Sequence, residues 1–112
     1  MDHKEHCHFV LYKEGKIIGY AHIQYWPQQV AALRIIVIDE QERNQGYGAH
    51  LLKFCEQTLE REGIKVLKTE SRADVIGFYK TQGYCEMPFD DPEGHPTHEN
   101  DTALGKNLRD EG

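Results

Sequence analysis

The residues best suited to chemistry lie in one short segment, Glu42 to His50, which reads ERNQGYGAH. Two glycines one residue apart, Gly46 and Gly48, follow Arg43 in an Arg-x-x-Gly-x-Gly string. Glycines at such a place either make a tight turn or leave the backbone bare, so that an anionic group can reach its N–H groups. The wider pattern to which this string belongs, Arg or Gln, two residues, Gly, one residue, then Gly or Ala, arises by chance in roughly one chain in ten of this length, so its meaning depends on its surroundings.

The segments on either side of this loop predict a strand and a helix. An aliphatic run, Leu33 to Ile38, comes before it and is apolar at nearly every position, which is typical of a central strand. After it, apolar residues recur at helical spacing from about Gly46 to Glu62, and Gly63 follows where a helix end favours left-handed backbone. The helix start adds unpaired N–H groups and a positive dipole end. This arrangement can bind an anionic group without a cationic side chain.

Periodicity and turn residues predict six more elements in the chain. They are strands at 8–12, 17–25, 65–69, 84–87 and 102–108, and a helix at 74–82. We expect Asp74 to be the N-cap of the second helix and Gly83 to end it. The order β-β-β-α-β-α-β-β predicts an α/β fold (α+β, mixed sheet) with helices packed on the sheet.

Length and composition narrow the class of protein. The 112 residues predict one domain, 1–112, with a flexible segment at 1–7 and a long acidic loop at 88–101 that is either functional or disordered. A net charge of −6 and the lack of a Lys/Arg-rich block argue against nucleic acid and suit a cationic small molecule or a lysine-bearing partner. The sequence has no run of eighteen apolar residues, so we expect no membrane span. Three cysteines without CxxC, and no apolar signal segment, predict a reducing, cytoplasmic location.

A second motif raises the significance of the glycine loop. The string FYKTQGY, which contains Phe78, Tyr79, Gly83 and Tyr84, follows the loop about thirty residues later. With LRIIVIDEQERNQGYGAHLLKFCEQTLEREGIKVL before it and ALGKNL near the end, residues 8 to 108 resemble the Gcn5-related N-acetyltransferase (GNAT) family. The resemblance implies the GNAT acyl-CoA N-acyltransferase fold, shortened at its N-terminus.

The resemblance also implies a cosubstrate, acetyl-CoA, without a metal, and roles for particular residues. The amides of 44–49 would hold the pyrophosphate, and the strand 36–38 would pair with the pantetheine arm and supply an N–H for the thioester oxygen. Tyr79 would protonate the leaving thiolate. The implied cofactor-binding residues are Ile36, Val37, Ile38, Arg43, Asn44, Gln45, Gly46, Tyr47, Gly48 and Ala49.

Several alternatives stay open at this point. The general base that deprotonates the primary amine acceptor is unassigned among Glu70, His22 and Gln24. A non-catalytic acyl-CoA-binding or interaction domain is the alternative function. Tyr79 also fits as an ordinary core aromatic, and the glycines as an ordinary turn.

Departures from the family pattern concern the acceptor side. Arg72 stands where many members have asparagine, and Val75 where alanine is common. The strand and two helices with which the family opens are missing. A short natural variant, a C-terminal piece of a longer protein and a homodimer that completes the wall in trans all explain this.

Histidines and carboxylates cluster in two further places. Histidines lie near the N-terminus and in the acidic loop, but without four ligands at paired spacing we expect no metal site: His3, His6 and His8 beside Cys7, then His95 and His98. The loop carboxylates are expected to be solvated, or else to attract a cationic amine: Asp90, Asp91, Glu93, Glu99 and Asp101. Cys55 falls on the apolar helix face and is expected in the core.

Overall fold

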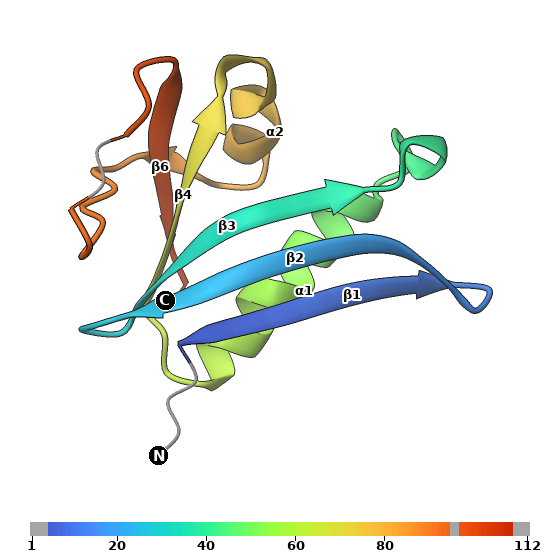
Figure 1. Ribbon diagram of the computed structural model, residues 1–112, viewed down its shortest axis with the longest axis horizontal. Helices are drawn as coiled ribbons and strands as arrows, with labels where there is room; N and C mark the ends of the chain where they lie inside the picture. The colour runs from blue at the N-terminus through green and yellow to red at the C-terminus, as the bar shows by residue number, and fades with distance from the viewer. Residues whose placement is uncertain (1–4, 95–96, 109–112) are drawn as a thin grey trace.

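A computed structural model describes residues 5–94 and 97–108 as six strands, two α-helices and two 3-10 turns (Figure 1). The histidines His3 and His95 lie outside the described residues. The elements are β1 (His6–Lys13), β2 (Lys16–Trp26), β3 (Val30–Ile38), η1 (Glu40–Glu42), α1 (Tyr47–Arg61), β4 (Val66–Arg72), η2 (Ala73–Val75), α2 (Ile76–Thr81), β5 (Cys85–Glu86) and β6 (Asp101–Asn107).

The strands form one mixed sheet in the order β1-β2-β3-β4-β6-β5. Only β3 and β4 run parallel, with α1 as their crossover, and the other neighbours are antiparallel. Every predicted strand and helix is present in the predicted order, which confirms the α/β mixed-sheet fold. The sequence reading missed both 3-10 turns, and β1 begins two residues earlier than predicted, so that His6 and Cys7 lie in a strand.

Local backbone conformation explains where the elements end. Glu14 and Gly15 both have positive φ, 52° and 80°, as a two-residue hairpin turn requires. Gly63 and Gly83 adopt φ of 90° and 96° just after α1 and α2, which confirms both predicted helix ends. The predicted N-cap role of Asp74 is wrong: Asp74 lies inside η2, and its carboxylate accepts from the Arg72 guanidinium instead.

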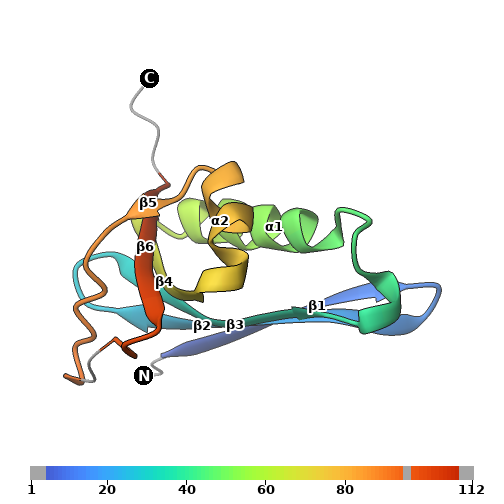
Figure 2. The same ribbon diagram turned by 90° about the horizontal axis from the view of Figure 1, so that it is seen from above.

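Both helices lie on the same side of the sheet, as Figure 2 shows. The core fills the space between this side and α1, whose residues Leu51, Leu52 and Leu59 are almost fully buried. Cys55 is also completely buried there, and burial raises the pKa of its thiol to about 12, so the predicted core role is confirmed. Cys7, Cys55 and Cys85 are all free thiols.

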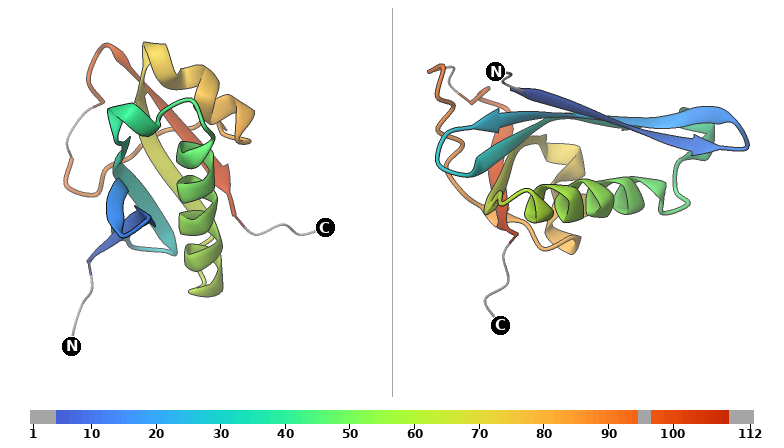
Figure 3. Two further views of the ribbon diagram at one scale, coloured as in Figure 1. Left: turned by 90° about the vertical axis from the view of Figure 1, so that its right-hand side faces the viewer. Right: turned by 90° about the horizontal axis from the view of Figure 1, so that it is seen from below.

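The other side of the sheet is covered only in part. The segment after β5 crosses it beside β3 and β4, at the opposite end from the β1–β2 turn (Figure 3). There Phe89 packs edge-on against Trp26 with ring centroids 4.9 Å apart, and the Arg34 guanidinium lies over both rings. Arg34 also forms an ion pair of 3.2 Å with Asp91, whose side chain is only 1% exposed. The sequence suggested a solvated carboxylate at Asp91. In the structure Asp91 is not solvated but anchors the loop.

Among the described residues, no helix has the length and apolar character needed to cross a membrane.

Candidate functional site

A cavity of about 890 Å³ lies where β3 and β4 separate. Figure 1 shows the two strands starting side by side and then diverging toward α2. The parallel pairing runs only from Val30–Val66 to Leu33–Thr69, although β3 continues to Ile38 and β4 to Arg72. The β4-facing backbone edge of residues 34–38 is therefore unpaired by β4 and borders the cavity.

One side-chain hydrogen bond marks the point of separation. The hydroxyl of Thr69, which is 2% exposed, donates to the carbonyl oxygen of Leu33 at 3.0 Å. Across β3, the pairing with β2 also shifts register between His22 and Ile23, which bends β3 at Arg34. Together these features direct the second half of β3 away from β4 and keep the cleft open.

The glycine loop closes one end of the cleft. Asn44 and Gly46 have φ of 64° and 86°, and Gly46 is the N-cap of α1 without any side-chain capping bond. The first helical bond runs from the His50 N–H to the Gly46 carbonyl, so the N–H groups of residues 47–49 have no partner from helix geometry. The first turn of α1 holds no acidic side chain. The helix end thus presents N–H groups and a positive dipole to the cleft.

Gly46 and Gly48 differ in their backbone conformation and in the space around them. Gly46 needs its left-handed backbone, whereas Gly48 has ordinary helical geometry. A Cβ at position 48 would meet the Phe78 ring at 3.7 Å and Ile38 Cγ1 at 3.8 Å, which are normal van der Waals distances. The protein alone therefore tolerates alanine at position 48, and the absence of a side chain there leaves space in the cleft.

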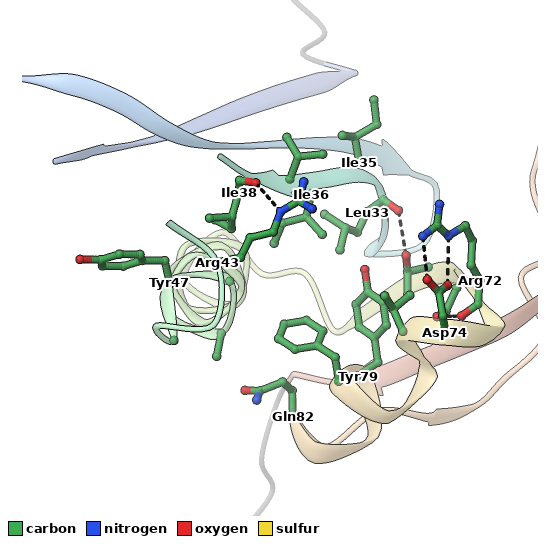
Figure 4. A pocket seen from close by; sticks show the side chains of 18 of the residues that line it. Leu33, Ile35, Ile36, Ile38, Arg43, Tyr47, Arg72, Asp74, Tyr79 and Gln82 are labelled. Atoms are coloured by element: carbon green, nitrogen blue, oxygen red, sulfur yellow. Dashed lines mark hydrogen bonds and ion pairs between the residues drawn. The ribbon is translucent and has the colours of Figure 1, made fainter. Parts of the chain in front are cut away.

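Tyr79 forms part of the inner wall and is 6% exposed. Its ring packs edge-on against Phe78 and Tyr84, with centroid distances of 5.3 and 5.4 Å. Figure 4 shows its hydroxyl directed toward β3, near Leu33. Burial raises the pKa of the Tyr79 phenol, and a contact with Thr69 opposes this only in part. The phenol is therefore protonated at neutral pH, and Tyr79 is both a buried aromatic and one of the residues that line the cleft.

The three candidate general bases differ in their position relative to the cleft and in their hydrogen bonds. Glu70 lines the cleft, and its Oε2 atom is buried without a hydrogen-bond partner in the part of the chain that the structure describes. The Gln24 amide oxygen accepts from Trp26 at 3.2 Å and from Arg34 at 2.8 Å. His22 lies away from the cleft lining, on the opposite side of the sheet from α1. Glu70 is the only one of the three that borders the cavity.

Charged pairs occupy the rim of the cleft. Lys13 donates to Glu42 at 2.9 Å and lies over the Tyr47 ring, 5.5 Å from its centroid. The Glu42 carboxylate is the main cause that raises the pKa of Lys13. Elsewhere in the cleft lining, the Arg72 guanidinium holds the pKa of Asp74 below its usual value through a 2.9 Å ion pair. Lys13 lies near the glycine loop, and the sequence analysis did not predict this cation there.

Nine of the ten residues predicted to bind the cofactor line the cleft. Gln45 does not line it, although it lies in the loop between two residues that do. The Arg43 side chain donates from Nε to the carbonyl of Ile38 at 3.0 Å and so ties the loop to the end of β3. Sequence reasoning missed Thr69, whose role depends on a partner 36 residues away. The lining residues from the prediction are Ile36, Val37, Ile38, Arg43, Asn44, Gly46, Tyr47, Gly48 and Ala49, together with Tyr79.

Across the residues that the structure describes, no three His, Cys, Asp or Glu side chains are grouped so as to hold a metal ion.

Comparisons of the sequence with a family model and with a curated protein agree on one family. A family model described as the acetyltransferase (GNAT) family matches residues 1–84. An uncharacterized N-acetyltransferase of Chlorobaculum tepidum is 33% identical over 82 residues, which is 70% of this chain and 50% of that protein. The chain thus spans about half the length of this curated relative.

Solved structures share the fold. Tetrahymena Gcn5 superposes with a TM-score of 0.81 at 21% identity, covering 96% of this chain and 71% of that one. The PaiA N-acetyltransferase of Thermoplasma acidophilum, solved in complex with coenzyme A, gives a TM-score of 0.78 at 15% identity, covering 92% and 61%.

Proposed function

The chain belongs to the acetyltransferase (GNAT) family, and from that premise we propose that it is an acetyl-CoA-dependent N-acetyltransferase acting on a primary amine in a ternary complex. The observation that carries the proposal is the separation of β3 and β4 beside a glycine loop and a helix start. This geometry offers an extended ligand both a free strand edge and a phosphate-binding helix end.

The cosubstrate fits the groups that this cleft presents. The N–H groups from Asn44 to Ala49 would hold the pyrophosphate. The free edge of β3 at Ile36 to Ile38 would pair with the amide-bearing pantetheine arm, like an additional strand. The small Gly48 would let the ligand pass close to the backbone. Binding would therefore come mostly from the main chain.

The chemistry that acetyl-CoA supplies is an activated acetyl thioester. A backbone N–H of residues 36–38 would donate to the thioester oxygen as negative charge develops there. The protonated phenol of Tyr79 would give its proton to the departing thiolate. Both roles need groups held in place before the reaction, as the buried packing of Tyr79 supports.

Glu70 is our proposed partner for the acceptor amine. Of the carboxylates that line the cleft, Glu42 and Asp74 are held in ion pairs, whereas a buried oxygen of Glu70 lacks a hydrogen bond in the described chain. Such an oxygen suits an ammonium or amine N–H, and it could accept the proton directly or through water. The acceptor would be a small-molecule amine or a lysine side chain, and the free thiols support a reducing, cytoplasmic setting.

A non-catalytic acyl-CoA-binding domain is the second candidate. The observation that favours it is the incomplete cover of the sheet face opposite α1, because an acceptor needs a wall as well as a cofactor cleft. Such a domain would bind coenzyme A through the same loop and strand edge but would turn nothing over.

The test is acetyl-CoA turnover against a panel of primary amines, read as release of free thiol. We expect Tyr79→Phe to keep coenzyme A affinity and lose at least tenfold in kcat. Tyr25→Phe is the matched control, since the Tyr25 hydroxyl donates to Glu62 at 2.7 Å outside the cleft. Binding without thiol release from any amine would support the binding-domain alternative, and equal losses in both variants would remove Tyr79 from the chemistry.

A further inference from the structure

Two buried hydroxyl groups, on Tyr79 and Thr69, lie together where β3 and β4 separate. Both residues line the cleft, and they are only 6% and 2% exposed. In Figure 4 the Tyr79 hydroxyl is directed toward the Leu33 carbonyl, where a dashed line marks the bond that this carbonyl accepts from Thr69 at 3.0 Å. The Tyr79 and Thr69 side chains are also close enough to share a hydrogen bond. The phenol, the hydroxyl and the carbonyl thus form a row of hydrogen-bonding groups.

Three elements of the fold hold these groups in place. Leu33 and Thr69 are the last cross-strand partners in the parallel pairing of β3 with β4. Tyr79 comes from α2, and its ring is fixed by edge-on packing against Phe78 and Tyr84. The arrangement is therefore set by contacts within the described chain before any ligand binds, as efficient proton transfer requires.

The number of protons available decides what Thr69 can do for Tyr79. A hydroxyl group has one proton to donate and two lone pairs that accept. The Thr69 proton goes to the Leu33 carbonyl, so the Thr69 oxygen is left as an acceptor for the protonated phenol. A phenolate, in contrast, can only accept. Rotation of the Thr69 proton about the Cβ–Oγ bond would then turn the same hydroxyl into a donor to Tyr79.

We propose that Thr69 is a positioning residue for proton transfer from Tyr79, and that its hydroxyl turns from the Leu33 carbonyl to the Tyr79 oxygen as the phenolate forms. The inference rests on the proposed role of Tyr79 as the acid. In this step the phenol O–H bond breaks, the proton forms an S–H bond with the departing thiolate, and the electron pair stays on the phenolate oxygen. Solvent returns a proton to the phenolate before the next turnover.

The free-energy gain comes from the charge on the acceptor. Thr69 exchanges a hydrogen bond to a neutral carbonyl for one to a charged oxygen, and charge-assisted bonds are roughly twice as strong as neutral ones. The bond is therefore strongest when Tyr79 has given up its proton. An interaction that strengthens along the reaction raises the rate, whereas one that is equal throughout does not.

Two other hydroxyl groups in this region are committed elsewhere. The Tyr84 hydroxyl donates to the largely buried Glu56 carboxylate at 2.7 Å. The Ser71 hydroxyl, two residues further along β4, donates to a neighbouring backbone carbonyl at 2.9 Å. Burial raises the pKa of the Tyr79 phenol, and the contact with Thr69 opposes this by favouring the phenolate. Thr69 is therefore the hydroxyl placed to offset the cost of a buried charge on Tyr79.

Turnover at saturating acetyl-CoA, with an amine found active in the panel, tests the proposal. Thr69→Val keeps the side-chain shape without the hydroxyl and should lower kcat about tenfold, whereas Thr69→Ser should stay within about threefold of the wild type. Thr58→Val is the matched control, because the Thr58 hydroxyl is buried without a partner in the described chain and lies outside the cleft lining. An unchanged kcat in Thr69→Val, or an equal loss in Thr69→Ser or Thr58→Val, would overturn the proposal.

A double-mutant cycle separates this role from general support of the fold. In a Tyr79→Phe background there is no phenol to ionise, so Thr69→Val should lower kcat no further. Losses of stability or of cofactor affinity would appear in Tm and KM, and they would not depend on the phenol. Full multiplication of the two kcat losses would show that Thr69 acts independently of Tyr79 and would contradict the proposal.

The ionisation of Tyr79 gives a readout that needs no turnover. Fluorotyrosine ionises at a lower pH than tyrosine, and fluorine NMR follows each incorporated residue, with the Tyr79 signal identified by its loss in Tyr79→Phe. Removing a donor disfavours the phenolate, so Thr69→Val should raise the pKa of Tyr79 and Thr69→Ser should not. This shift in a protein that turns over no amine would refute the proposed function yet confirm the bond between the two hydroxyls. An unchanged or lowered pKa would overturn the inference itself.

Discussion

Replacing Gly48 with alanine should separate a structural glycine from a ligand-binding one. In the protein alone, the added Cβ would make ordinary contacts of 3.7 Å with Phe78 and 3.8 Å with Ile38. Alanine favours a helix over glycine by up to about 1 kcal/mol, so Gly48→Ala should raise Tm by up to about 4 °C. Gly77→Ala is the matched control, because Gly77 has the second position of α2, open space around it and no place in the cleft lining.

Coenzyme A should distinguish the two variants. At a concentration of about 100 times Kd, the ligand stabilises the wild-type protein by about 2.7 kcal/mol. A tenfold loss of affinity in Gly48→Ala would reduce this to about 1.4 kcal/mol at the same concentration, while Gly77→Ala should keep the full effect. The assay is thermal unfolding with and without coenzyme A. If Gly48→Ala gains the same ligand stabilisation as the wild-type protein, the glycine serves no ligand and the reasoning fails.

Three further predictions concern single residues, of which Thr69 and Tyr79 line the cleft and Lys106 lies outside it. Thr69→Val keeps the side-chain shape but removes the bond to the Leu33 carbonyl, so unfolding free energy should fall by about 1 to 3 kcal/mol and cofactor affinity should drop; an unchanged denaturant midpoint would contradict this. Lys106→Met removes the 2.9 Å partner of the largely buried Glu56 carboxylate, which also accepts from Tyr84, and should cost about 1.5 to 3 kcal/mol in urea unfolding. The kcat of the wild-type enzyme should fall at alkaline pH only above about 10, the ordinary pKa of tyrosine, because burial raises the pKa of Tyr79; a fall near neutral pH that Tyr79→Phe abolishes would be inconsistent with this.

Local patterns predicted the fold well because they report local physics. The apolar spacing of α1 and the aliphatic run of β3 determine element type directly, and Gly63 and Gly83 mark helix ends through a backbone preference. The glycine loop was also recognisable, since its chemistry depends on backbone geometry between a strand and a helix that are adjacent in the chain.

Features that depend on distant partners were not predictable in this way. The acidic loop looked solvated from composition, but Asp91 is buried because Arg34, 57 residues earlier, reaches it between two aromatic rings. The Thr69 hydroxyl donates to the carbonyl of Leu33, which lies 36 residues earlier in the chain, before α1. Asp74 fits an N-cap by residue type, yet the neighbouring Arg72 binds its carboxylate. In each case a long-range or competing charge contact decides the outcome.

A titration with coenzyme A, followed through backbone amide NMR signals, tests the central claim most directly. The account predicts the largest shifts at the amides of residues 44–49 and at the free edge of β3 from Ile36 to Ile38, with little change in β1. Absence of shifts at millimolar coenzyme A, or shifts concentrated away from this loop and strand edge, would contradict it.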